Sequence, residues 1–128
     1  MSVGILLLTH EDMGTALAAT ARHILGRIAL DVDAFSIPPG SDVEVALSAA
    51  AARVRALDSG DGVLVLADVY GATPSNVAAR LAPLGLNVRR VAGLNLPMLL
   101  RVLNYPEQSL AELALTAEHG GRVGIRID

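Results

Sequence analysis

Two continuous apolar runs constrain the fold of this chain more than any other feature. Residues 3–8 read Val-Gly-Ile-Leu-Leu-Leu, and residues 62–67 read Gly-Val-Leu-Val-Leu-Ala. Strands with one wet face alternate apolar and polar residues, whereas strands covered on both faces are apolar throughout. Such doubly covered strands are typical of parallel sheets with helices on each side. The chain is therefore expected to have an α/β fold.

The rest of the chain alternates between helical and strand patterns. Apolar residues at helical spacing predict helices over residues 13–25, 43–57, 96–103 and 110–121, and another helix with Thr73 as its N-cap. Shorter apolar stretches predict strands over residues 32–37 and 87–92. Ser41 and Ser109 each precede a glutamate by three residues, which is the spacing of a capping box at a helix start.

The alternation of strands and helices predicts a doubly wound, mostly parallel sheet with helices on both faces and the strand order 2-1-3-4. We interpret residues 1–128 as a single domain of this kind. Residues 122–127 alternate in character, so they are expected to form an antiparallel edge strand. Gly120 and Gly121 before them are typical of a hinge. The sequence allows this strand to fold back on its own sheet or to exchange with that of a second copy.

Composition excludes several classes of function. The formal net charge is −3, lysine and cysteine are absent, and Phe35, Tyr70 and Tyr105 are the only aromatic residues. These features speak against nucleic-acid binding, Walker-type phosphate loops, cysteine-ligated metals, and thiol or Schiff-base chemistry. No apolar run approaches the roughly 20 residues of a membrane span, and the apolar start lacks the features of a signal peptide. We expect a cytoplasmic protein without membrane insertion, metal or cofactor.

Each apolar run is followed by a polar residue, and the two side chains can hydrogen-bond to each other. His10 follows the first run, and Asp68 follows the second. In the predicted order these two strands are neighbours about 4.8 Å apart, and their carboxyl ends flank the crevice where open α/β sheets bind ligands. A hydrogen bond from one ring nitrogen of His10 to Asp68 leaves the other nitrogen free as a nucleophile. Alone, Asp68 is equally typical of an aspartate that caps a turn.

Two loops that contain glycine follow the third and fourth strands. Gly71 allows a tight turn before the helix that starts at Thr73, and the Thr73 hydroxyl is expected close to the same crevice. The second loop continues into Leu96-Pro97-Met98-Leu99. Its apolar residues suit a surface that docks a partner better than they suit polar catalysis. A packed connection is the alternative for Leu96 and Leu99.

These segments resemble the mannose-type enzyme IIA domain of the bacterial sugar phosphotransferase system. The resemblance lies in Leu8–Glu11, Pro39-Gly40, Asp68–Ala78 and Gly93–Leu99, in family order and with family-like spacing over nearly the whole chain. The family's usual Gly-Gly-Ser-Pro turn is Gly71-Ala72-Thr73-Pro74 here, which keeps a hydroxyl group and adds a methyl group.

The resemblance implies a carrier that takes a phosphoryl group from phospho-HPr and passes it to a IIB partner. His10 matches the family's phosphorylated histidine and Asp68 its aspartate partner, so we assign both as catalytic residues. We expect Thr9, Gly71 and Thr73 at the phosphoryl group, and the Leu96–Leu99 loop as the docking surface. The family also implies a homodimer that exchanges its C-terminal strand.

Two alternatives remain open. A receiver-like signalling module would be phosphorylated on Asp68 and use Glu11 and Asp12 as an acidic metal pair, but receivers resemble one another in a phosphate-contacting lysine that this chain lacks. A non-catalytic interaction domain is the other alternative, against which the presence of His10 and Asp68 argues. For a carrier, the sequence does not distinguish sugar uptake from a regulatory phosphorelay, and it identifies neither the sugar nor the phosphorylated ring nitrogen.

Overall fold

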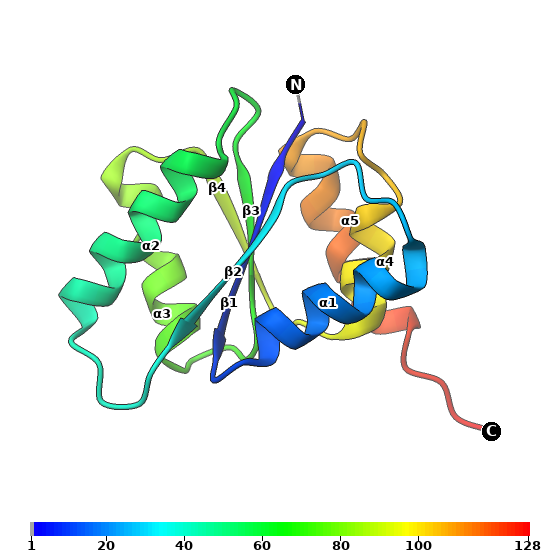
Figure 1. Ribbon diagram of the computed structural model, residues 1–128, viewed down its shortest axis with the longest axis horizontal. Helices are drawn as coiled ribbons and strands as arrows, with labels where there is room; N and C mark the ends of the chain where they lie inside the picture. Colours follow the sequence, from blue (N-terminus) through cyan, green and yellow to red (C-terminus); the bar gives the residue numbers. More distant parts are fainter. Residues whose placement is uncertain (1) are drawn as a thin grey trace.

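The computed structural model describes residues 2–128, with a parallel sheet at the centre (Figure 1). Its strands are β1 (Gly4–His10), β2 (Val32–Ile37), β3 (Val63–Ala67) and β4 (Val88–Ala92). They pair in the order β2-β1-β3-β4, and every pairing is parallel. The predicted α/β class and strand order are therefore confirmed. The carboxyl ends of β1 and β3 lie side by side at one edge of the sheet.

Helices cover both faces of this sheet. They are α1 (Met13–Leu25), α2 (Val43–Leu57), α3 (Thr73–Ala79), α4 (Leu96–Leu103) and α5 (Leu110–Val123), with a short 3₁₀ helix, η1 (Ala82–Leu84). α2 and α3 lie on one face, whereas α1, α4 and α5 lie on the other (Figure 1). Across residues 2–128, no helix combines the length and the apolar character that crossing a membrane requires.

The first apolar run contributes to the hydrophobic clusters on both sides of the sheet. Ile5 and Leu7 belong to the cluster under α1, α4 and α5, while Leu6 and Leu8 belong to the cluster under α2 and α3. All four side chains are fully buried, and removing each from water contributes about 1.5–3 kcal/mol. Burial on two faces explains why the run lacks polar alternation. It also holds the carboxyl end of β1 in a fixed position.

The helix starts differ in part from those predicted. The capping box at Ser109 is present at the start of α5. At α2, Asp42 rather than Ser41 is the N-cap, because its carboxylate accepts hydrogen bonds from two backbone N–H groups of the first turn. The Ser41 hydroxyl instead donates to a carbonyl of the preceding loop. At α3 the N-cap is Ala72, so Thr73 lies in the first turn and does not cap the helix.

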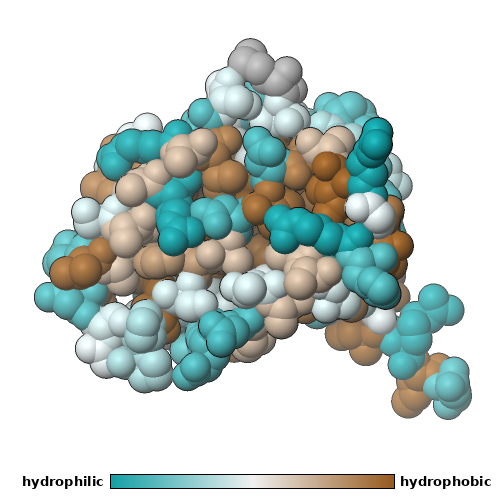
Figure 2. All heavy atoms as spheres, in the orientation of Figure 1, coloured by the Kyte–Doolittle hydropathy of each residue, from teal (hydrophilic) through white to brown (hydrophobic). Residues whose placement is uncertain are grey.

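The prediction of a strand over residues 122–127 is wrong for the single chain. α5 continues to Val123, and the residues after it form no strand in the part of the chain that the structure describes. We call residues 124–128 the C-terminal tail. The tail projects away from the body of the molecule (Figures 1 and 2), and its side chains Ile125 and Ile127 are 77% and 97% exposed.

Gly120 and Gly121 are packing positions rather than the predicted hinge. A Cβ atom on Gly120 would lie 2.6 Å from the Cβ of Arg101, and one on Gly121 would lie 2.9 Å from the Cε of Met98. Both contacts are with α4, and real Cβ atoms do not approach other atoms so closely; the contact at Gly120 is the stricter one, because the Cβ of Arg101 cannot move aside as the end of the Met98 side chain can. The glycines therefore allow α5 to lie against α4, and the helix continues through them.

Candidate active site

The strand order brings His10 and Asp68 together at the carboxyl edge of the sheet. Leu8 of β1 is paired with Ala67 of β3; His10 ends β1 two residues after Leu8, and Asp68 directly follows Ala67, so both lie at the same edge of the sheet. Nδ1 of His10 lies 2.7 Å from Oδ2 of Asp68. The backbone N–H of His10 donates to the same oxygen over 2.9 Å. The hydrogen bond expected from the strand order is therefore present.

Asp68 is the buried member of this pair. Its side chain is 5% exposed, compared with 43% for the side chain of His10. Its Oδ1 atom accepts a hydrogen bond from the backbone N–H of Val69 over 2.9 Å. Burial raises the pKa of Asp68, but the hydrogen bonds from His10 and Val69 outweigh burial, so the pKa lies below its ordinary value of 3.8. Near neutral pH, Asp68 is a carboxylate that only accepts hydrogen bonds.

The ionised carboxylate determines which nitrogen of a neutral His10 carries the proton. Because a group that only accepts hydrogen bonds faces Nδ1, the proton is on Nδ1. The lone pair of the neutral ring is then on Nε2. The pair therefore presents one nucleophilic nitrogen to an incoming molecule, on a ring that is partly open to solvent.

The lowered pKa of Asp68 predicts a pH-dependent contribution to stability. A carboxyl group whose pKa is lowered by folding stabilises the fold above its unfolded-state pKa, and this contribution is lost as the pH falls through the folded-state value. Relative to Asp68→Asn, which does not titrate, we expect the wild type to lose unfolding free energy below pH 3.8. Urea unfolding of both proteins between about pH 7 and pH 2 measures the difference. A difference that stays constant over this range would contradict the assigned ionisation.

The turn after His10 is held by contacts that the sequence analysis did not identify. Glu11 has a φ of +48°, and the hydroxyl of Ser36 on β2 donates a hydrogen bond to the backbone carbonyl of Glu11. Thr9 is fully buried, and its Oγ1 accepts a hydrogen bond from the backbone N–H of Gly14 over 3.0 Å. Thr9 therefore supports the start of α1, and its hydroxyl is committed inside the protein.

The loop after Asp68 carries the other predicted phosphoryl-binding residues. Gly71 has a φ of +88°, a left-handed conformation that favours glycine. Its carbonyl accepts a hydrogen bond from the Asn76 side chain over 3.2 Å, which closes the loop onto α3. Thr73 is exposed, and its hydroxyl does not cap the helix. This hydroxyl is therefore available to a ligand.

The predicted docking loop Leu96–Leu99 lies largely in the core. Its last two side chains are buried under α1 and α5, and its first two residues are only half-exposed. The exposed apolar side chains close to the pair in sequence are instead those of Met13, Val69 and Tyr70. Met13 begins the helix that follows His10, and the other two follow Asp68 directly. Their position beside the predicted site residues was the signal that could have identified them.

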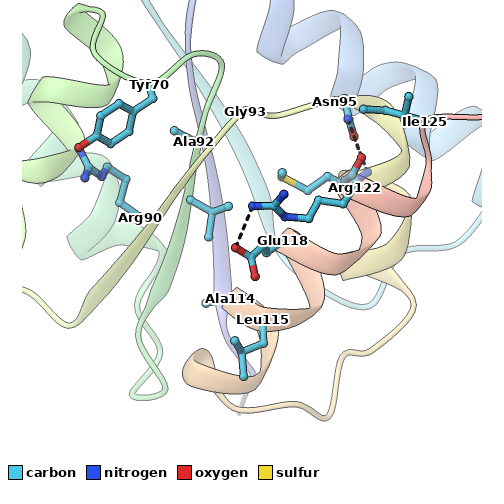
Figure 3. A pocket seen from close by; sticks show the side chains of 13 residues that line it. Tyr70, Arg90, Ala92, Gly93, Asn95, Ala114, Leu115, Glu118, Arg122 and Ile125 are labelled. Atoms are coloured by element: carbon cyan, nitrogen blue, oxygen red, sulfur yellow. Dashed lines mark hydrogen bonds and ion pairs between the residues drawn. The ribbon is translucent and has the colours of Figure 1, made fainter.

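A groove lies between β4 and the C-terminal half of α5 (Figure 3). Its volume is about 510 Å³. Tyr70 and Arg90 lie at one side of the groove, and the ion pair of Glu118 with Arg122 on α5 lies at the other. The groove follows β4, which is the last strand in the order of the sheet. It is therefore continuous with a strand edge that has no neighbour within residues 2–128.

Comparison with known proteins identifies the family of this chain. The family model EIIA-man, described as PTS system fructose IIA component, matches residues 4–117. The mannose-specific EIIAB component of the PTS system from Escherichia coli strain K12 is 31% identical over 128 residues, which are 98% of this chain and 39% of that protein. The chain thus spans about two fifths of the length of the curated relatives that it matches.

Solved structures agree with the family match. The mannose/sorbose specific IIA subunit of the phosphotransferase system from Enterococcus faecalis has a TM-score of 0.87 at 29% identity, covering 100% of this chain and 96% of that one. The PTS IIA protein associated with the fucose utilization operon from Streptococcus pneumoniae has a TM-score of 0.80 at 26% identity, covering 99% and 96%. The protein therefore belongs to the EIIA-man family, the mannose-type IIA components of the phosphotransferase system.

Proposed function

We propose that this protein is a phosphohistidine carrier in which His10 accepts a phosphoryl group from phospho-HPr and passes it to a IIB protein. The observation that carries the proposal is the 2.7 Å contact between Nδ1 of His10 and the buried carboxylate of Asp68, which leaves Nε2 as the nucleophile. The name of the EIIAB relative, which joins a IIA and a IIB part in one protein, supports a IIB partner.

The proposed reaction is an in-line displacement at phosphorus. The Nε2 lone pair of His10 forms a bond to phosphorus while the bond from phosphorus to the donor's ring nitrogen breaks, and the electron pair of that bond returns to the donor's ring. Because Nδ1 keeps its proton, the phosphorylated ring of His10 carries positive charge. Asp68 compensates this charge through a charge-assisted hydrogen bond. Transfer to the IIB protein breaks the new bond and returns its electron pair to Nε2.

Asp68 has a second effect on the loaded carrier. Its negative charge lies close to the phosphoryl dianion and disfavours retention of that dianion. The phosphohistidine therefore stays a good donor, as a site that must load and unload requires. The exposed Thr73 hydroxyl and the backbone of the Gly71 turn are the groups that we assign to the phosphoryl oxygens. Thr9 supports the site indirectly, because its buried hydroxyl oxygen accepts the hydrogen bond from the backbone N–H of Gly14 at the start of α1.

The exposed side chains of Met13, Val69 and Tyr70 form the surface that we assign to partner docking. They replace the Leu96–Leu99 loop in this role, because half of that loop is buried in the core. We further propose that residues 1–128 act as one domain in the cytoplasm, without a bound metal or cofactor.

Phosphorylation by a reconstituted donor chain tests the proposed function. The protein is incubated with phosphoenolpyruvate, enzyme I and HPr, and the label is analysed by its chemical stability and by ¹⁵N NMR of the histidine ring. We expect a label that is labile in acid, stable in base and bonded to Nε2 of His10. A label on Nδ1 would contradict the role assigned to Asp68, and an unlabelled protein would indicate a non-catalytic interaction domain.

A receiver-like module phosphorylated on Asp68 is the alternative that the same experiment excludes. An acyl phosphate on Asp68 would be labile in base and cleaved by hydroxylamine. The geometry gives this alternative little support, because Asp68 is 5% exposed and both of its oxygens accept hydrogen bonds from the protein.

We also propose that the protein forms a homodimer through the C-terminal tail. The tail carries the exposed side chains Ile125 and Ile127, and the open edge of β4 adjoins the groove beside α5. Pairing of the tail with β4 of a second copy would satisfy that edge. It would also bury the two isoleucines, each worth about 1.5–3 kcal/mol when fully removed from water.

Truncation after Val123 is expected to convert the dimer to a monomer while α5 stays intact, because the helix ends at that residue. Sedimentation velocity of the full-length and truncated proteins at micromolar concentration measures this change. Arg126→Ala is the matched control, since it alters the tail without removing either isoleucine, and it should remain dimeric. A full-length protein that sediments as a monomer would exclude the dimer and leave the proposal for His10 unaffected.

A further inference from the structure

Arg90 on β4 contacts both ends of residues 70–75, the segment that carries Thr73. The carbon atom at the centre of its guanidinium group lies 5.1 Å from the centroid of the Tyr70 ring, which is a cation–π distance. Its Nη1 group donates a hydrogen bond to the backbone carbonyl of Ser75 over 3.2 Å, and the Ser75 hydroxyl lies 3.4 Å away. Figure 3 shows Arg90 lying against the Tyr70 ring. One side chain thus joins β4 to both sides of the turn.

Arg90 makes these contacts instead of an ion pair. Among residues 2–128, no carboxylate lies within 4.0 Å of its guanidinium nitrogens, whereas Arg53, Arg80 and Arg122 each pair with an acid. Ser75 is fully buried, so one end of the contact is firmly anchored. The guanidinium group of Arg90 therefore stabilises the position of residues 70–75 through Tyr70 and Ser75.

The segment between the two contacts is anchored at its C-terminal end, where Pro74 is buried and the Ala72 carbonyl accepts a hydrogen bond from the backbone N–H of Asn76, whereas Gly71 and Thr73 are exposed. Asn76 reaches back to the Gly71 carbonyl, and the Thr73 hydroxyl does not cap α3. Tyr70 is largely exposed, so the packing of its ring depends strongly on Arg90. Arg90 therefore limits the movement of residues 70–75 relative to β4. Because β4 is paired with β3, which ends next to Asp68, this also ties the segment to the His10 site.

We propose that Arg90 is a positioning residue for phosphoryl transfer. It holds residues 70–75 so that the Thr73 hydroxyl faces the phosphoryl group on His10, and it acts through Tyr70 and Ser75 without touching the phosphoryl group itself. The inference rests on the proposed function and adds to it a residue that lies outside the His10–Asp68 pair.

Steady-state transfer from phospho-HPr in matched variants tests this role. We expect Arg90→Ala to lower kcat about tenfold, because small displacements of a positioned group slow the chemical step, and to raise KM by less than this through the docking residue Tyr70. Arg90→Lys should recover part of the rate, since an ammonium group can also lie over the ring and donate to Ser75. Arg89→Ala is the control, because Arg89 is the exposed neighbour on the same strand, and it should behave as the wild type.

A double-mutant cycle tests whether Arg90 acts through the Tyr70 ring. If the two residues act as one unit, Tyr70→Leu combined with Arg90→Ala should be about as slow as the slower single variant, and the effects should not add. Thermal unfolding of each variant verifies that the fold is intact. Arg90→Gln, which keeps two of the three methylene groups and a donor but removes the charge, replaces Arg90→Ala if that variant does not fold.

Three results would overturn the inference, and they are distinguishable. Equal rates for the variants at Arg90 and Arg89 would show that Arg90 has no part in transfer. A rise in KM alone would show that Arg90 docks the donor protein instead of positioning Thr73. A wild-type protein that takes no label from phospho-HPr would overturn the proposed function, and the role of Arg90 with it.

Discussion

Replacement of His10 by alanine is expected to abolish phosphoryl acceptance. Nε2 of His10 is the one nitrogen that the contact with Asp68 leaves free as a nucleophile in this site, and an alanine side chain has no atom that could accept the group. The variant removes one partner of the buried Asp68 carboxylate and should lose some stability, but the fold should persist because the backbone N–H of residue 10 still donates to that carboxylate. Transfer of label from phospho-HPr, followed on a gel together with thermal unfolding, measures both effects.

The other two histidines are the matched controls for this experiment. His23 on α1 and His119 on α5 are exposed and make no contact with Asp68. His23→Ala and His119→Ala should therefore accept label as the wild type does. Acceptance of label by His10→Ala, or its loss in either control variant, would show that the phosphoacceptor has been assigned to the wrong residue.

Asp68→Asn is expected to slow transfer by about 10²- to 10⁴-fold, the range typical of lost general acid–base or orienting groups. An asparagine must place its NH₂ group either against Nδ1 and the backbone N–H of His10 or against the backbone N–H of Val69, so it cannot keep all the hydrogen bonds that orient the ring. The variant also loses the negative charge that stabilises the phosphorylated ring. The fold should persist, because the amide oxygen can still accept the hydrogen bond from the His10 backbone.

Asp12→Asn is the control for the change of charge. Asp12 is an exposed carboxylate in the turn after His10, and its side chain does not cap α1. Single-turnover transfer should be close to the wild-type rate in this variant. If instead Asp12→Asn were as slow as Asp68→Asn, the negative charge of the region rather than the orientation of His10 would control the reaction.

The fold could be predicted where local pattern and packing give the same answer. The run at residues 3–8 is apolar because both faces of β1 are covered, and this cause can be read from the run itself. The prediction failed at Gly120 and Gly121, because a glycine pair is typical both of a helix end and of close packing between helices. The distinction depends on Arg101 and Met98, which belong to a different helix.

In the candidate site too, some contacts could be predicted from the sequence and others could not. The contact between His10 and Asp68 could be predicted, because strand order alone brings the two strand ends together. The support that Ser36 gives to the turn and the contact of Arg90 with Tyr70 could not, since each depends on the position of a side chain from another strand. The Leu96–Leu99 loop appeared suited to docking because an apolar face that packs inward has the same residue pattern as one that binds a partner.

The double contact at Oδ2 of Asp68 bears on how the proposed carrier would meet its partners. The ring of His10 has one hydrogen-bonded orientation in this structure, in which Nδ1 faces Asp68 and Nε2 faces away from it. In the proposed carrier, donor and acceptor would approach this one nitrogen, so the two proteins would exclude each other from the site. The proposed carrier would therefore deliver in strict alternation, with the spent donor leaving before the acceptor arrives. An excess of dephosphorylated HPr should consequently act as a competitive inhibitor of delivery to the IIB protein.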